Sequence, residues 1–162
     1  MPFVTPDTPN LTDFLTFLAE SVQIPVAALP VSSVWPGYAF NKAIALVLNV
    51  PGVPGIMYSL AVYNCATALL FLITPDVQGQ TYFADARSSA VSTNFPSGGF
   101  GINSPSTGLV VSTSDESTST TLTAPTWAAG MNIDDLGYYK TPWGRYYLAF
   151  QQKYGSTIWG LT

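Results

Sequence analysis

The chain has 162 residues, enough for one globular domain with a single core, and 48% of them are hydrophobic, 14% aromatic and only 9% charged. The net charge is -4 and the few basic residues are scattered, which argues against binding to a nucleic-acid backbone, because such binding needs clustered Lys and Arg. About a quarter of the residues are charged in an average soluble domain, so we expect copies of the chain or a partner protein to cover the surplus apolar surface.

The N-terminal part predicts a helix after a proline-rich start. Residues 1–9 contain three prolines and no charged stretch followed by an apolar run, so they do not resemble a secretory signal peptide and predict synthesis in the cytoplasm. Asn10 can cap the first helix, with Asp13 in its first turn. Helical spacing predicts that its buried stripe consists of Leu11, Phe14, Leu15 and Leu18.

A second helix is predicted over residues 36–50. Pro25 and Pro30 precede it and indicate a turn or a short extended link. Pro36 is tolerated in the first turn of a helix, and the Pro and Gly residues of 51–55 end it. The expected apolar face of this helix consists of Phe40, Ala43, Ile44, Val47 and Leu48.

The most apolar segment covers residues 56–73 and carries no charge. Its 18 residues are at the lower limit for a transmembrane helix. Three polar residues lie within it, Ser59, Asn64 and Thr67, and no Lys or Arg flanks either end. These features favour a central helix of a bundle, buried on nearly all sides, in which Asn64 needs an internal hydrogen-bond partner.

Beyond this helix the pattern becomes mixed. Residues 80–90 indicate a short helix, and residues 92–108 form a long loop rich in Gly, Pro and Ser, of a kind that an assembling protein often orders against its neighbour. Residues 109–113 and 117–122 then predict two strands joined in a hairpin around residues 114–116.

The C-terminal quarter predicts two further helices and a tail. The first covers residues 132–139, with Asp134 and Asp135 in its first turn. The second starts at Thr141 as cap and Pro142 as first residue, and ends at Gly155. The tail that follows is too apolar to be left free in water, which predicts that it docks on the body or on a neighbour.

The sequence offers little for catalysis. It contains no histidine, so the commonest general base and the usual partner of a Ser or Cys nucleophile are missing. The single cysteine, Cys65, lies in an apolar stretch and is predicted to be a small buried hydrophobe. The adjacent acids Asp134 and Asp135, like Asp115 and Glu116, are expected to be solvated or capping residues. We therefore predict no catalytic residue, no metal site and no cofactor.

A glycine-rich stretch at residues 98–101 invites comparison with a phosphate-binding loop. The Lys and Ser/Thr that complete such a loop are absent, and no apolar strand precedes it. We predict a flexible loop instead.

The predicted functional residues belong to a partner interface at the C-terminus. Arg and Trp are enriched in interface hot spots, and Arg145 lies close to Trp143 along the chain. Ordinary helix packing with a solvated Arg explains the same residues, and both interpretations stay open. The full candidate set is Trp143, Arg145, Tyr154, Ile158, Trp159 and Leu161.

Together these elements predict a mainly α fold, a bundle of three to five helices with a small β-hairpin and an extended C-terminal tail. One domain covers residues 1–162. Within it we expect a helical core at residues 10–75, a loop and β-hairpin at 92–123, and a C-terminal helix with a docking tail at 132–162.

The first half of the chain carries a pattern of three helices. A proline-rich start leads into Asn10-Leu11-Thr12-Asp13-Phe14, an Ala-rich helix covers residues 40–48, and a third helix begins Met57-Tyr58-Ser59-Leu60-Ala61-Val62-Tyr63-Asn64. This organisation resembles the small head-tail connector, or adaptor, proteins of tailed bacteriophages. The hairpin and the Trp-rich C-terminal quarter depart from the smallest members of that family, and no motif transfers a functional residue.

The resemblance implies a structural virion protein and not an enzyme. Copies of a helical bundle would form a homo-oligomeric ring, bind the portal protein and tail proteins, link capsid to tail and line the channel for genome ejection. DNA would pass an acidic lumen without specific binding. The resemblance also implies that residues 154–162 dock on a neighbouring protein, and that the chain is made in the host cytoplasm, ends in the virion and needs no membrane.

Two other classes stay open. Another virion component, such as a tail-completion, tail-tube or decoration protein, would use the Ser/Thr-rich strands as its working part. A small membrane-acting protein would be built around residues 56–73.

Overall fold

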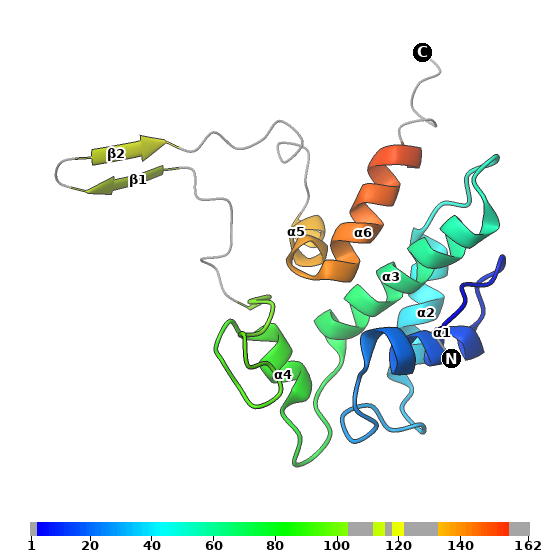
Figure 1. Cartoon of the computed structure of the whole chain (residues 1–162), viewed down its shortest axis with the longest axis horizontal. Coiled ribbons are helices and arrows are strands. Elements are labelled where there is room, and N and C mark those ends of the chain that lie inside the picture. Colours follow the sequence, from blue (N-terminus) through cyan, green and yellow to red (C-terminus); the bar gives the residue numbers. More distant parts are fainter. Residues whose placement is uncertain (1–2, 104–111, 116–117, 122–132, 156–162) are drawn as a thin grey trace.

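The helices of the chain are organised around one long central helix. The computed structural model describes residues 3–103, 112–115, 118–121 and 133–155. Within these residues it contains six α-helices, two of which continue as short π-helical turns (Figure 1). The central helix is α3 (Gly55–Ile73), on which α2 (Trp35–Leu46) and α6 (Pro142–Phe150) both pack. The prediction of a mainly α fold is confirmed, and the number of helices exceeds the predicted three to five because the short helices form as well.

The first helix begins at its predicted cap. Asn10 Oδ1 accepts a hydrogen bond from the backbone N–H of Asp13 at 2.8 Å, and α1 (Leu11–Phe17) follows. The chain continues as the π-helical segment η1 (Leu18–Val22). Gln23 then ends the helix with a φ of 61°, and its backbone N–H donates to the carbonyl of Leu18.

The buried faces of α1 and α2 differ from those predicted. On α1, Phe17 is buried, whereas Leu11 and Leu15 are 40% and 43% exposed. On the second segment, Ile44 and Leu48 are 40% and 57% exposed, and α2 ends before residue 47 rather than at residue 50. Periodicity identifies the apolar residues of a helix, but the position of its neighbours selects which of them are covered.

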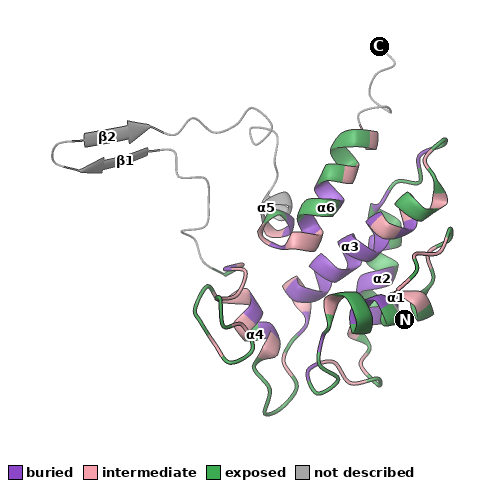
Figure 2. Cartoon of the chain, in the orientation of Figure 1, coloured by how far each residue is buried: buried purple, intermediate pink, exposed green. Residues whose placement is uncertain are grey.

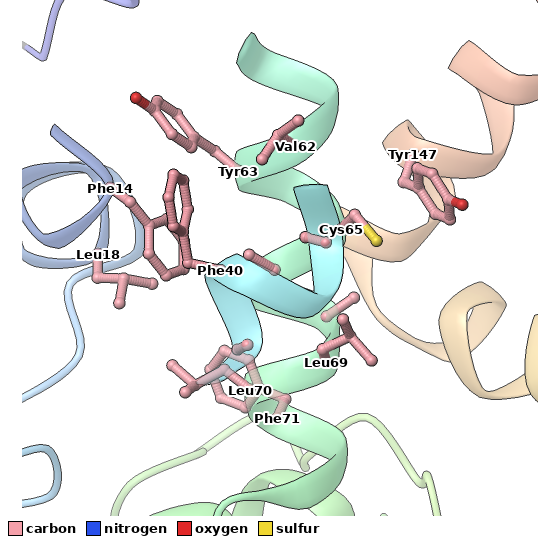
Figure 3. Close-up of a cluster of buried hydrophobic side chains, with 14 of the residues drawn as sticks. Phe14, Leu18, Phe40, Val62, Tyr63, Cys65, Leu69, Leu70, Phe71 and Tyr147 are labelled. Carbon is pink, nitrogen blue, oxygen red and sulfur yellow. The ribbon is translucent and has the colours of Figure 1, made fainter. Parts of the chain in front are cut away.

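Helix α3 is buried along most of its length, as predicted for a central bundle helix (Figure 2). Tyr63 points toward α1 and α2, where its ring lies 5.7 Å from that of Phe14 and 6.3 Å from that of Phe40 (Figure 3). Asn64 has the internal partner that it needs, because its Nδ2 donates to the carbonyl of Leu60 at 2.8 Å.

Helix α4 (Tyr82–Arg87) is shorter than the predicted 80–90 and is tied to the end of α3. The carboxylate of Asp76 accepts the backbone N–H groups of Phe83 and Ala84 at 2.7 and 2.8 Å and so caps α4. Nη1 of Arg87 donates to the carbonyl of Thr74 at 2.9 Å, where the last carbonyls of α3 need partners.

Two short strands follow the loop. They are β1 (Ser112–Asp115) and β2 (Thr118–Thr121), which pair antiparallel with Ser112 opposite Thr121. Residues 114 and 115, predicted as the turn, belong to β1 instead. Residues 116–117 and the predicted strand residues 109–111 and 122 lie outside the described part. The described strands are only four residues each, so the predicted β-hairpin is not supported as part of the fold.

Two helices complete the fold, α5 (Ile133–Lys140) and α6, which continues as η4 (Gln151–Gly155). Thr141 is buried and caps α6 as predicted, since its Oγ1 accepts the N–H of Gly144 at 3.0 Å. A Cβ on Gly144 would lie 2.0 Å from the carbonyl oxygen of Tyr138, so only glycine lets the two helices approach this closely. The buried apolar side chains of the described residues form one cluster, from Phe14 to Leu148.

Candidate functional site

The described residues show no arrangement for metal chemistry. They contain no group of three or more His, Cys, Asp or Glu side chains that could hold a metal ion. Asp115 belongs to β1, and Glu116 lies outside the described residues. Asp134 and Asp135 are on α5, where their side chains are not described.

Cys65 is buried, as predicted, on the side of α3 that faces α6 (Figure 3). Burial raises the pKa of its thiol to about 12, and a hydrogen bond with the side chain of Tyr147 opposes this shift only in part. The thiolate is the nucleophilic form of cysteine, so Cys65 is chemically inert at neutral pH.

The glycine-rich loop at residues 98–101 is packed against α4, which corrects the prediction of a flexible loop. The N–H of Phe100 donates to the carbonyl of Ala86 at 2.7 Å, and the N–H of Gly101 donates to that of Ser88 at 3.2 Å. A Cβ on Gly99 would lie 2.1 Å from the carbonyl oxygen of Asp85. The backbone donors that a phosphate would need are therefore used to cap α4.

Trp143 is partly buried and packs against the chain's own core. Its ring lies parallel to that of Phe71, with an interplanar angle of 2° and 4.9 Å between centroids. Phe100 meets the ring of Trp143 edge-on at 5.6 Å. Of the two interpretations left open for Trp143, helix packing is the one that its contacts favour.

Of the other predicted interface residues, the structure describes Arg145 and Tyr154. Arg145 is exposed on α6, beside Tyr146, which is 69% exposed. Tyr154 is half-buried against Phe150, with 4.9 Å between ring centroids. The remaining members, Ile158, Trp159 and Leu161, lie outside the described residues.

The sequence did not predict an apolar groove beside the end of α6. The groove has a volume of about 260 Å³ and lies between the segment that follows α2 and the start of η4. We call it the α6 groove. Its lining residues are Leu48, Val50, Phe150, Gln151 and Gly155.

A second unpartnered surface lies on α1 and η1. Leu11 and Leu15 stand one helical turn apart, and Ala19 and Glu20 follow on the exposed side. We call these four residues the α1–η1 face. Tyr63 of α3 contacts α1, whereas Cys65 faces α6. Side chains two positions apart in a helix point about 200° away from each other around its axis. Helices α1 and α6 therefore pack on opposite sides of α3.

A second hollow, of about 350 Å³, lies between the loop after η1 and the end of α3. Thr74 lines it, and its buried Oγ1 has no hydrogen-bond partner among the described residues. Asp76 also lines it, but both of its carboxylate oxygens already cap α4. The arrangement contains no pair of groups that would support a reaction.

Helix α3 is the described helix that is long and apolar enough to cross a membrane, with a mean hydropathy of 1.9 over its most apolar stretch. Inside the fold, 67% of that stretch is buried. Such burial against α2 and α6 favours the interpretation of α3 as a core helix.

Comparisons with known proteins add no relative. The chain matches no model of a protein family, no curated protein and no solved structure.

The α6 groove and the α1–η1 face were not predicted from the sequence, because the apolar residues of both were assigned to the core. Their signal was an excess of apolar residues over what one core of this size can cover.

Proposed function

We propose that the chain is a non-catalytic structural subunit, the head-tail connector or adaptor of a tailed bacteriophage, which forms a homo-oligomeric ring below the portal. The observation that carries this proposal is apolar surface that the chain's own core leaves uncovered. Leu11 and Leu15 on α1 are 40% and 43% exposed, and Ile44, Leu46 and Leu48 at the end of α2 are 40%, 40% and 57% exposed. Apolar surface of this extent is typical of proteins that are completed by other protein.

The helical architecture supports the adaptor over the other virion components. A tail-tube protein would depend on its strands, whereas the bundle around α3 accounts for the core of the described residues. In the proposed ring, the short β1–β2 ribbon, as a hairpin, and the tail at residues 156–162 are the parts that reach neighbouring proteins. A tail-completion or decoration protein is the alternative within the same class.

The proposal is tested by light scattering and negative-stain microscopy of the purified chain, alone and with a candidate portal protein. We expect a ring, or a monomer that becomes a ring on the portal. A stable monomer that never joins the portal would contradict the adaptor function. Partition into liposomes would favour the membrane-acting class instead.

The role of the tail is tested by a truncation chosen from the structure. Because Tyr154 packs on Phe150, the chain is cut after Gly155, so that η4 stays complete. We expect portal binding to be lost while the helical circular dichroism spectrum and the melting temperature are unchanged. Trp159→Ala is the milder variant, and Val31→Ala, at an exposed apolar residue of the N-terminal part, is the control. Unchanged binding by the truncated chain would remove the tail from the proposal.

A further inference from the structure

We propose that the hollow between the loop after η1 and the end of α3 is a binding site for a small uncharged molecule, a hydroxyl-bearing ring of the size of a monosaccharide. We call this hollow the η1–α3 pocket. Its lining comes from residues 28–35 and 74–77. Its volume of about 350 Å³ lies within the range of roughly 300–1,000 Å³ that is typical of small-molecule sites. The inference goes beyond the proposed assembly and does not depend on it.

The buried hydroxyl of Thr74 points to a ligand. Thr74 lines the pocket and is only 1% exposed, so it lies at the floor. Its Oγ1 has no hydrogen-bond partner among the described residues. Thr67 of α3 shows the usual arrangement, because its buried Oγ1 donates to the carbonyl of Tyr63 at 2.8 Å. An unpartnered buried hydroxyl destabilises a fold, and a ligand hydroxyl that reaches the floor would satisfy it.

The charges around the pocket favour an uncharged ligand. Asp76 belongs to the lining, and each of its carboxylate oxygens accepts a backbone N–H at the start of α4. Its negative charge is thereby stabilised within the fold. Among the described residues no Lys or Arg lines the pocket. A phosphate or a carboxylate would therefore find no cation to pair with there.

The wall of the pocket adds an aromatic side chain on a fixed loop. Trp35 is the first residue of α2, lines the pocket and is partly exposed. An indole combines a large apolar face with a polar N–H, which suits a ring with an apolar face and hydroxyls at its edge. The N–H of Ser33 donates to the carbonyl of Pro30 at 2.8 Å and so holds the loop in place. A purely apolar ligand would leave the hydroxyl of Thr74 unpartnered, whereas a neutral sugar can satisfy both the indole and the hydroxyl.

Saturation-transfer NMR titrations of the full chain test the site, and they work for a monomer as well as for a ring. The probes are D-glucose, D-galactose and D-mannose, with D-galacturonate as the charged counterpart of galactose. We expect at least one neutral hexose to bind with a dissociation constant on the order of 1 mM, since a small ligand makes few contacts. Galacturonate should not bind, because its carboxylate meets no cation.

Variants at the floor and at the wall locate the binding. Thr74→Val should weaken it about tenfold and yet melt above Thr67→Val, because it removes an unpartnered hydroxyl whereas Thr67→Val removes a hydrogen bond. Thr67→Val should bind as the wild type does. Trp35→Leu should also weaken binding, and Tyr38→Leu, at a more exposed aromatic residue outside the lining, should not.

The site is wrong if none of the three hexoses binds, or if binding survives both Thr74→Val and Trp35→Leu. Equal binding of galactose and galacturonate would contradict the uncharged class of ligand. If Thr74→Val melts no higher than Thr67→Val, the hydroxyl is already satisfied in the free protein, which contradicts a site built on it. None of these measurements depends on a ring, so their failure leaves the proposed function standing.

Discussion

The rings of Phe71 and Trp143 lie parallel, with an interplanar angle of 2° and a distance of 4.9 Å between their centroids. This stack joins the end of the central helix α3 to the first turn of α6, although 72 positions separate the two residues in the sequence. It explains why the Trp beside Arg145 belongs to the fold, while Arg145 itself stays at the surface.

Trp143→Ala should lower the free energy of unfolding by about 2–4 kcal/mol, because it removes the stack on Phe71 and the edge contact of Phe100. Trp143→Phe should keep most of the stability. Urea titration followed by circular dichroism measures the effect, with Tyr146→Ala on the exposed side of α6 as the control, expected within about 0.5 kcal/mol of the wild type. Equal stability of the Trp143→Ala and Tyr146→Ala proteins would contradict a core role for the indole ring.

Arg87→Met should destabilise the chain by about 1–2 kcal/mol, since the carbonyl of Thr74 loses its charged donor at the end of α3. Arg87→Lys should recover part of the loss, because an ammonium group also interacts favourably with a helix C-terminus. Arg145→Met removes the same charge from an exposed position and serves as the matched control. The prediction fails if the Met variants at 87 and 145 melt at the same temperature.

Gly144→Ala should cost about 1–3 kcal/mol, because its Cβ would lie 2.0 Å from a backbone oxygen that cannot move without shifting the end of α5. Gly155→Ala meets no atom within 4 Å and should be neutral or slightly stabilising. Thermal unfolding of the two alanine variants compares them directly. A stable Gly144→Ala protein would show that α5 and α6 can separate at little cost.

The folded chain should lose stability as the pH rises above the pKa of an ordinary cysteine thiol. In the unfolded chain Cys65 loses its proton near pH 8.5 to 9, whereas burial holds its pKa at about 12 in the folded chain. Between these values the folded state binds one more proton, so the free energy of unfolding falls by up to about 1.4 kcal/mol per pH unit. Burial also raises the pKa of Tyr63 and Tyr82, which adds to the fall.

Cys65→Ala isolates the contribution of the thiol to this alkaline loss. Its free energy of unfolding, measured by urea titration from pH 8 to above pH 11, should decline less steeply than that of the wild type. Thiol labelling at neutral pH provides the second check, because the folded protein should react only as fast as it opens. Rapid labelling of the folded chain, or equal alkaline slopes, would contradict a buried thiol.

Local signals in the sequence determined where helices begin and how much helix the chain contains. Asn10 and Thr141 were predicted as caps, and both accept the expected backbone hydrogen bond. The uncharged run that became α3 was predicted nearly to its ends. These features depend on contacts between residues three or four apart, and such contacts can be predicted from spacing alone.

The tertiary structure alone decided which apolar residues are covered. Leu15 and Phe17 of α1 are equally plausible core residues by composition, yet Phe17 packs against Tyr63 at 5.7 Å between ring centroids and Leu15 is exposed. For Trp143 the sequence left a partner contact and helix packing both open, and the stack of its ring on Phe71 favours helix packing. Coverage depends on neighbours that are distant in sequence, and periodicity carries no information about where those neighbours lie. The α1–η1 face and the α6 groove became visible only when the helices were placed around α3.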